Sequence, residues 1–222
     1  MERKRVVITG MGLITPVGGT FEEYWQGITC GRAAIRPISR FTVAGAVPLG
    51  GEVADSIFTT DELKAVAPDA DRALLMARAA AARALRDAGV DPAAPEPKDI
   101  ALYLGTGAGP TGAVEESYLA FAAGGPRALR PRTVIRTMFN SLAAHLGIDL
   151  KLCGPQISIA AACASANAAI CRATAAIRTG EAVQVLTGGV EMPLCAAVYA
   201  SWMAMRILSP SSDPQAAALP FH

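Results

Sequence analysis

The residue of greatest chemical interest in this sequence is Cys163, which stands where an extended apolar segment meets an alanine-rich one. Residues 156–160 alternate around two isoleucines, which predicts a short buried strand, and residues 164–179 are mostly good helix formers. A thiol at the first turn of a helix feels the positive end of the helix dipole, which favours the thiolate, and free backbone N–H groups there can bind an oxyanion. Such a cysteine is suited to accept an acyl group.

A structural role for Cys163 is the alternative. Unpaired cysteine is among the residue types most often buried, and a small apolar side chain packs well in an alanine-rich segment. The local pattern therefore leaves both a nucleophile and a core residue open.

The residues around Cys163 also resemble those of a known family. The segments Gly154-Pro155 and Ser158-Ile159-Ala160-Ala161-Ala162-Cys163-Ala164-Ser165 look like the nucleophile region of the β-ketoacyl-acyl carrier protein synthases, the condensing enzymes of fatty acid and polyketide synthesis. Further segments agree with this family in order along the chain: residues 5–12, 15–18, 105–109, 187–191 and 206–209, and Pro220-Phe221. The resemblance implies a thiolase-like layered α/β sandwich. Residues 1–222 would be its N-terminal domain, with the C-terminal domain absent.

The resemblance also implies a reaction and partners. Cys163 would take an acyl group from acyl carrier protein, and its own backbone N–H would supply part of the oxyanion hole. Decarboxylation of malonyl carrier protein would then give a carbanion that attacks the acyl-cysteine. We expect no metal or redox cofactor, and we expect a homo- or heterodimer with a ketosynthase chain.

The histidines limit what this chain would do alone. The family's decarboxylation step uses two histidines from the second half of its sequence, whereas this chain has only His145 and His222. His145 is most simply a packed helix residue, and His222 stands where the family's Pro-Phe-Asp usually has Asp. We therefore expect a need for a complementary C-terminal half. The alternatives are a non-catalytic chain-length or scaffold partner, which usually lacks the nucleophile, and an inactive truncated chain.

Ala108 is the second candidate site residue. It aligns with a position where many relatives hold a bulky apolar residue against the acyl pocket, so a longer or wider acyl group would be admitted here. Its other interpretation is a small residue in a glycine-rich turn.

Two glycine-rich segments suggest nucleotide binding but do not meet its requirements. Gly10-Met11-Gly12 would need a third glycine where Thr15 stands, and residues 105–109 lack the Gly-Lys-Ser/Thr ending of a P-loop. No cofactor site is therefore predicted.

Composition excludes several classes of protein. The net charge of +1 argues against a nucleic-acid-binding face. The five cysteines lack a Cys-x-x-Cys pair, which argues against a disulfide framework or thiolate metal site and favours a cytoplasmic setting. No segment has the apolar length needed to cross a bilayer.

The remaining patterns predict the elements that position Cys163. Helices are expected over residues 21–25, 70–88, 114–122 and 133–146, and strands over residues 6–9, 100–104 and 182–187, with one more near 43–53. Thr20 and Glu23 have the spacing of a capping box for the first helix, and Leu74, Ala77, Ala81 and Leu85 would form one stripe on the second. The strand, turn, helix and strand of residues 156–187 predict a βαβ unit whose two strands pair in parallel. Because the helix after Cys163 is apolar or small nearly all round, we expect it to lie between two layers.

Overall fold

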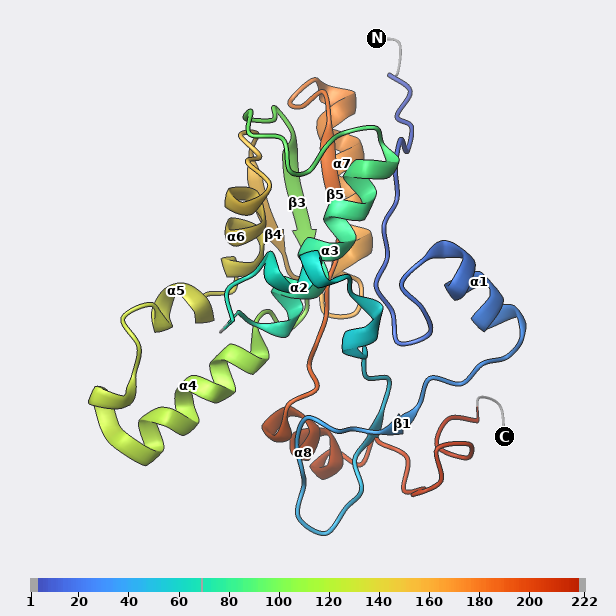
Figure 1. Cartoon of the computed structure of the whole chain (residues 1–222), viewed down its shortest axis with the longest axis vertical. Coiled ribbons are helices and arrows are strands. Elements are labelled where there is room, and N and C mark those ends of the chain that lie inside the picture. The colour runs from blue at the N-terminus through green and yellow to red at the C-terminus, as the bar shows by residue number, and fades with distance from the viewer. Residues whose placement is uncertain (1–3, 69, 220–222) are drawn as a thin grey trace. The chain divides into compact units, whose positions relative to one another are not determined.

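The computed structural model describes residues 4–68 and 70–219. The chain forms two compact parts, and the larger one comprises the N-terminal residues up to Leu13 together with Thr60–Met192. This part holds the three-stranded sheet, the helices that cover it and Cys163 (Figure 1). Pro220, Phe221 and His222 lie outside the described residues.

The sheet consists of β3 (Ala101–Gly105), β4 (Gln156–Ile159) and β5 (Val185–Gly189), all parallel, in the order β4-β3-β5. The strands predicted over residues 100–104, 156–160 and 182–187 are confirmed, and so is the parallel direction of the last two. The expectation that β4 and β5 pair with each other is wrong, because β3 lies between them. All five residues of β3 are buried, which suits a central strand.

One face of this sheet is covered by α7 (Ser165–Thr179), the helix that follows Cys163. Its buried Ala173 and Ala176 pack against Ala101 and Tyr103 of β3, and Gly180 ends it in the left-handed conformation. The helix is therefore confirmed. Within this chain it is covered on its sheet side, while Ile170 on α7 remains 47% exposed.

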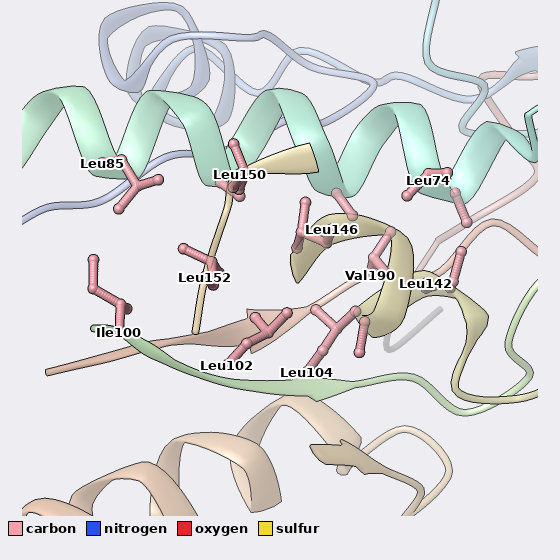
Figure 2. Close-up of a cluster of buried hydrophobic side chains, with 14 residues drawn as sticks. Leu74, Leu85, Ile100, Leu102, Leu104, Leu142, Leu146, Leu150, Leu152 and Val190 are labelled. Carbon is pink, nitrogen blue, oxygen red and sulfur yellow. The ribbon is translucent and has the colours of Figure 1, made fainter. Parts of the chain in front are cut away.

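The other face carries α3 (Arg72–Asp87) and α6 (Ser141–Asp149), which bury a cluster of leucines over β3 (Figure 2). Leu74, Ala77, Ala81 and Leu85 form the predicted buried stripe of α3. Asp71 caps that helix through a 2.8 Å hydrogen bond from the Ala73 N–H to its Oδ1.

The segment before α6 differs from the prediction of one helix over residues 133–146. That stretch instead forms two helices, α5 (Thr133–Thr137) and α6, which begins after a break. Met138 adopts an extended conformation at that break, which ends α5. The helix predicted over residues 114–122 is confirmed as α4 (Thr111–Gly124), and the 3₁₀ turn η2 (Gly125–Ala128) follows it. A short helix, α2 (Thr60–Lys64), precedes α3.

The predicted strand over residues 6–9 is wrong. These residues form no strand, and Val7 and Ile8 are 65% and 81% exposed. The residues just after this segment instead lie against α3. The Met11 N–H donates to Asp87 Oδ2 at 2.8 Å, and a side chain at Gly10 or Gly12 would collide with the backbone of Ala84 or Ala80. An apolar β-branched run becomes a strand only where neighbouring backbone pairs with it.

The second part of the chain comprises Ile14–Thr59 and the residues from Pro193 onward. It contains α1 (Phe21–Thr29), the two-residue strands β1 (Arg36–Pro37) and β2 (Leu49–Gly50), η1 (Asp55–Ile57) and α8 (Ala196–Ala204). The capping box of α1 between Thr20 and Glu23 is confirmed. Among the described residues, no helix is both long and apolar enough to span a membrane.

Candidate active site

Cys163 lies in the turn between β4 and α7, two residues before the first residue of the helix. Ala162 beside it has a φ of +47°, in the left-handed region that side chains other than glycine rarely occupy. Two backbone hydrogen bonds close the turn, from the Ala164 N–H to the Ala161 carbonyl at 3.0 Å and from the Ser165 N–H to the Ala162 carbonyl at 3.1 Å. The strand-to-helix turn predicted for the nucleophile is thus present.

Ser165 holds this turn in its strained conformation. Its side chain is buried, and its Oγ accepts a hydrogen bond from the Ala161 N–H at 2.8 Å and donates one to the Ala162 carbonyl at 2.7 Å. These bonds offset the strain at Ala162, which is on the order of 1–3 kcal/mol. Sequence reasoning missed Ser165, although serine beside a helix N-terminus is a known sign of side-chain bonding to local backbone.

The thiol of Cys163 is exposed, so the alternative of a buried core cysteine does not hold in this structure. Cys195 is the buried thiol, and Cys30, Cys153 and Cys171 are exposed. Across residues 4–68 and 70–219, the Cys163 N–H donates to no other group. A free N–H next to an exposed thiol can bind the oxygen of a carbonyl that the sulfur attacks.

The loop after β3 brings Ala108 toward the same turn. Ala108 is exposed, and its neighbour Gly107 faces Ala162, where an added Cβ would lie 3.1 Å from the carbonyl oxygen. Thr106 is buried and its Oγ1 accepts a hydrogen bond from the Gly109 N–H at 3.0 Å. The two predicted site residues therefore belong to loops that are in contact.

Two glycines at the ends of the strands let α7 begin close to the sheet. A Cβ at Gly105, the last residue of β3, would collide with the backbone of Ser165 and Ala166. A Cβ at Gly189, the last residue of β5, would lie 2.6 Å from the Ala166 Cβ. The site thus depends on close backbone approach, which only glycine permits.

Glu191 joins the ends of β5 and β3 next to this turn. Its carboxylate accepts hydrogen bonds from the N–H groups of Gly107 at 2.6 Å and Ala108 at 3.3 Å. Residues 187–191 contributed to the family resemblance, but sequence reasoning assigned Glu191 no role.

His145 lies elsewhere in the larger part of the chain. It is half-buried on α6, in the wall of a cavity of about 120 Å³ that includes neither Cys163 nor Ala108. Burial raises the pKa of Asp71 in that wall, against the opposing effect of two backbone N–H donors. Burial also raises the pKa of Asp149, and Arg78 opposes this shift. The position of His145 agrees with the prediction of a packed helix residue.

Side chains that could bind a metal are not grouped in the described part of the chain. No cluster of three or more His, Cys, Asp or Glu residues there could hold a metal ion. All five cysteines are free thiols.

Comparison with known proteins identifies relatives along the whole chain. Residues 3–221 match the family model described as "Beta-ketoacyl synthase, N-terminal domain". The 3-oxoacyl-[acyl-carrier-protein] synthase 2 of Synechocystis sp. is 33% identical over 100% of this chain and 54% of its own length. The tetracenomycin polyketide synthase ketoacyl synthase alpha subunit of Streptomyces glaucescens is 31% identical over 98% of this chain and 53% of its own.

A solved structure shares the fold. The ishigamide ketosynthase/chain length factor superposes with a TM-score of 0.82 and 29% identity, over 95% of this chain and 53% of that one. The expected thiolase-like α/β fold is therefore confirmed. The chain spans about half the length of the curated relatives and the solved structure that it matches.

Proposed function

We propose that this chain, which belongs to the family of the β-ketoacyl synthase N-terminal domain, supplies the acyl-accepting nucleophile of a β-ketoacyl-acyl carrier protein synthase. The observation that carries the proposal is the exposed thiol of Cys163 at the strand-to-helix turn, beside its own free N–H. The family relationship supports the class of reaction, and the geometry of the turn supports Cys163 as the residue.

In the proposed first step, the Cys163 thiolate attacks the carbonyl carbon of an acyl thioester on acyl carrier protein. The carbonyl oxygen becomes an oxyanion, which the Cys163 N–H stabilises. Collapse of this intermediate breaks the bond to the carrier's sulfur, so the carrier leaves as its thiolate and the acyl group remains on Cys163. The acyl-cysteine is then the electrophile for the carbanion formed when malonyl carrier protein loses CO₂.

We propose that Ala108 lines the acyl pocket. Its loop is in contact with the nucleophile turn through Gly107 and Ala162, and its single methyl group leaves room for substrate carbon. The carbons are delivered by the carrier, so the proposed reaction uses no metal and no redox cofactor. The proposed partners are acyl carrier protein and a second ketosynthase chain in a homo- or heterodimer.

We propose further that a complementary ketosynthase half covers part of the surface around the site. The exposed Ile170 on α7 supports this, as do the exposed Val7 and Ile8, with which no strand in the described part of the chain pairs. Burial of such apolar side chains against a partner is favourable. Such a half would also supply the histidine pair for decarboxylation.

A second candidate function is a chain-length partner of an active synthase. The similarity to the ishigamide ketosynthase/chain length factor supports that possibility. The exposed Cys163 favours the catalytic role over this one, because a non-catalytic partner has no need of a nucleophile.

The decisive experiment is acylation of the chain by acyl carrier proteins loaded with saturated acyl groups, with adducts mapped by mass spectrometry. We expect the acyl mass on Cys163, no transfer to a Cys163→Ala variant at any chain length, and normal transfer to Cys171→Ala, the matched control on α7. Acylation that persists in Cys163→Ala would refute the proposal.

The pocket assignment has its own test in the same assay. Filling the site with Ala108→Phe is expected to shorten the range of acyl chains accepted, because the added ring takes up pocket volume. If the chain-length profile does not change, Ala108 is only a turn residue.

A further inference from the structure

We propose that Glu191 is a positioning residue that fixes the loop bearing Ala108 against the nucleophile turn and thereby sets which acyl chains reach Cys163. This inference rests on the proposed function and deepens it. Glu191 itself need not touch the substrate, because it acts through the backbone of residues 106–108.

The position of Glu191 follows from the end of β5. The Val190 N–H donates to the Gly105 carbonyl at 3.0 Å, so the chain continues along the end of β3 for one more residue. This places the Glu191 carboxylate at the start of the loop that leaves β3. Glu191 Oε2 accepts from the Gly107 N–H at 2.6 Å, and Oε1 accepts from the Ala108 N–H at 3.3 Å and lies 3.4 Å from Thr106 Oγ1.

The bonded N–H groups belong to the residues that matter for the proposed pocket. One is the N–H of Ala108 itself, and the other is that of Gly107, which faces Ala162 one residue before the nucleophile. Hydrogen bonds to a carboxylate are shorter and stronger than those to a neutral acceptor. The Glu191 carboxylate therefore holds Gly107 and Ala108 in place more firmly than a neutral acceptor would.

The rest of the loop is held by different contacts. Gly109 has a φ of +68°, and a Cβ there would lie 3.2 Å from the Phe139 ring. Its N–H donates to Thr106 Oγ1. If the carboxylate of Glu191 were removed, the far end of the loop would remain anchored while Gly107 and Ala108 would be free to move. The expected consequence is a change at the pocket wall and not unfolding.

The test compares Glu191→Gln and Glu191→Ala with Glu96→Gln, a matched control at an exposed glutamate in the proline-rich segment before β3. Each variant is studied in the ketosynthase assembly that supports acylation. The readout is the ratio of Cys163 acylation rates with a short and a long saturated acyl carrier protein, measured with the melting temperature.

We expect Glu191→Ala to change this ratio and to lower the faster of the two rates by roughly 10- to 100-fold, because a shift of about 1 Å in how the substrate is held can cost up to about 100-fold in rate. Glu191→Gln keeps one acceptor oxygen, so its ratio should shift in the same direction by less. Glu96→Gln should leave the ratio unchanged.

Two outcomes separate this inference from the proposed function. A ratio that stays at the wild-type value in both Glu191 variants, while Cys163→Ala abolishes acylation, overturns the positioning role alone, even if the melting temperature falls. Acylation that survives in Cys163→Ala overturns the proposed function. If Glu191→Ala does not fold, Glu191→Gln decides, because an unchanged ratio there also overturns the positioning role.

Discussion

The two faces of the sheet are packed by different kinds of side chain. On one face, Leu102 and Leu104 of β3 meet leucines of α3 and α6 (Figure 2). On the other face, Ala101 and Tyr103 of the same strand meet Ala173 and Ala176 of α7. The leucine face holds the larger cluster of buried apolar side chains, and burial of apolar surface is the main source of stability. The alanine face lets a helix approach the strands closely.

The proposed chemistry also lies on the alanine face. Cys163 precedes α7, and the glycines that end β3 and β5 touch the first residues of that helix. A bulky residue between α7 and the sheet would move the thiol, the Cys163 N–H and the loop of Ala108 relative to one another. The comparison therefore suggests that the leucine face supplies stability while the alanine face supplies geometry.

The largest expected effect on stability comes from the leucine face. Leu102 is 1% exposed, so Leu102→Ala removes buried methyl groups and leaves a cavity. The expected loss is about 2–5 kcal/mol of unfolding free energy, measured by urea denaturation. Well below the melting temperature, the acylation rate of Cys163 should stay near wild type. A large fall in that rate in the folded variant would contradict the division between the two faces.

A smaller loss of stability, with a larger effect on activity, is expected from the alanine face. Ala173 is buried against the sheet, so Ala173→Leu overpacks the interface at a cost of about 1–3 kcal/mol. Because the added side chain pushes α7 outward, acylation should slow sharply even where the protein is folded.

The control for Ala173→Leu is the same substitution at Ala175, which lies exposed on the same helix. Ala175→Leu should change neither the unfolding free energy nor the acylation rate appreciably. Equal effects of the two substitutions would show that the close approach of α7 does not matter.

The reactivity of the exposed thiols can be ranked by their rates of alkylation. Cys163 and Cys171 are both exposed, but only Cys163 lies at the N-terminal end of α7. We expect iodoacetamide to modify Cys163, the proposed nucleophile, several-fold faster than Cys171, Cys30 or Cys153, as measured by peptide mass spectrometry. Faster labelling of Cys30 or Cys171 would argue against an activated thiol.

The smallest effect on stability is expected from Glu181, whose carboxylate is bonded to Tyr103 of the alanine face. Tyr103 Oη donates to Glu181 Oε1 at 2.9 Å, and Arg172 Nη2 binds both oxygens of the same carboxylate. The hydrogen bonds from Arg172 and then Tyr103 lower the pKa of Glu181. A carboxyl group with a lowered folded-state pKa stabilises the fold above its unfolded value, which for glutamate is about 4.3, and this stabilisation is lost as the pH falls through the folded value.

Glu181→Gln should therefore melt slightly below wild type at neutral pH, and the difference should disappear at acidic pH. Asp71 and Asp149 titrate in the opposite sense, because burial raises their pKa values, but both proteins contain them. The quantity to compare is thus the difference in melting temperature between the two proteins from pH 7 downward. A difference that does not depend on pH would show that Glu181 acts through packing and not through charge.

Local sequence patterns were sufficient for several elements. The capping box of Thr20 and Glu23, the buried stripe of α3 and the strand, turn and helix around Cys163 depend on residues close together in the chain. Such features follow from periodicity and hydrogen bonding within one or two turns, which a sequence displays directly. The family resemblance added the candidate roles of Cys163 and Ala108.

Contacts between distant residues decided the rest. Residues 6–9 have the composition of a strand, but no backbone within residues 4–68 and 70–219 pairs with them, and β3 enters the sheet between β4 and β5. Glu191 follows β5, yet it binds the N–H groups of Gly107 and Ala108, more than 80 positions earlier. Composition indicates that a segment is apolar or that a carboxylate is present. The packing of the elements decides which backbone groups lie next to an apolar segment or a carboxylate. Only the tertiary structure could therefore assign these partners.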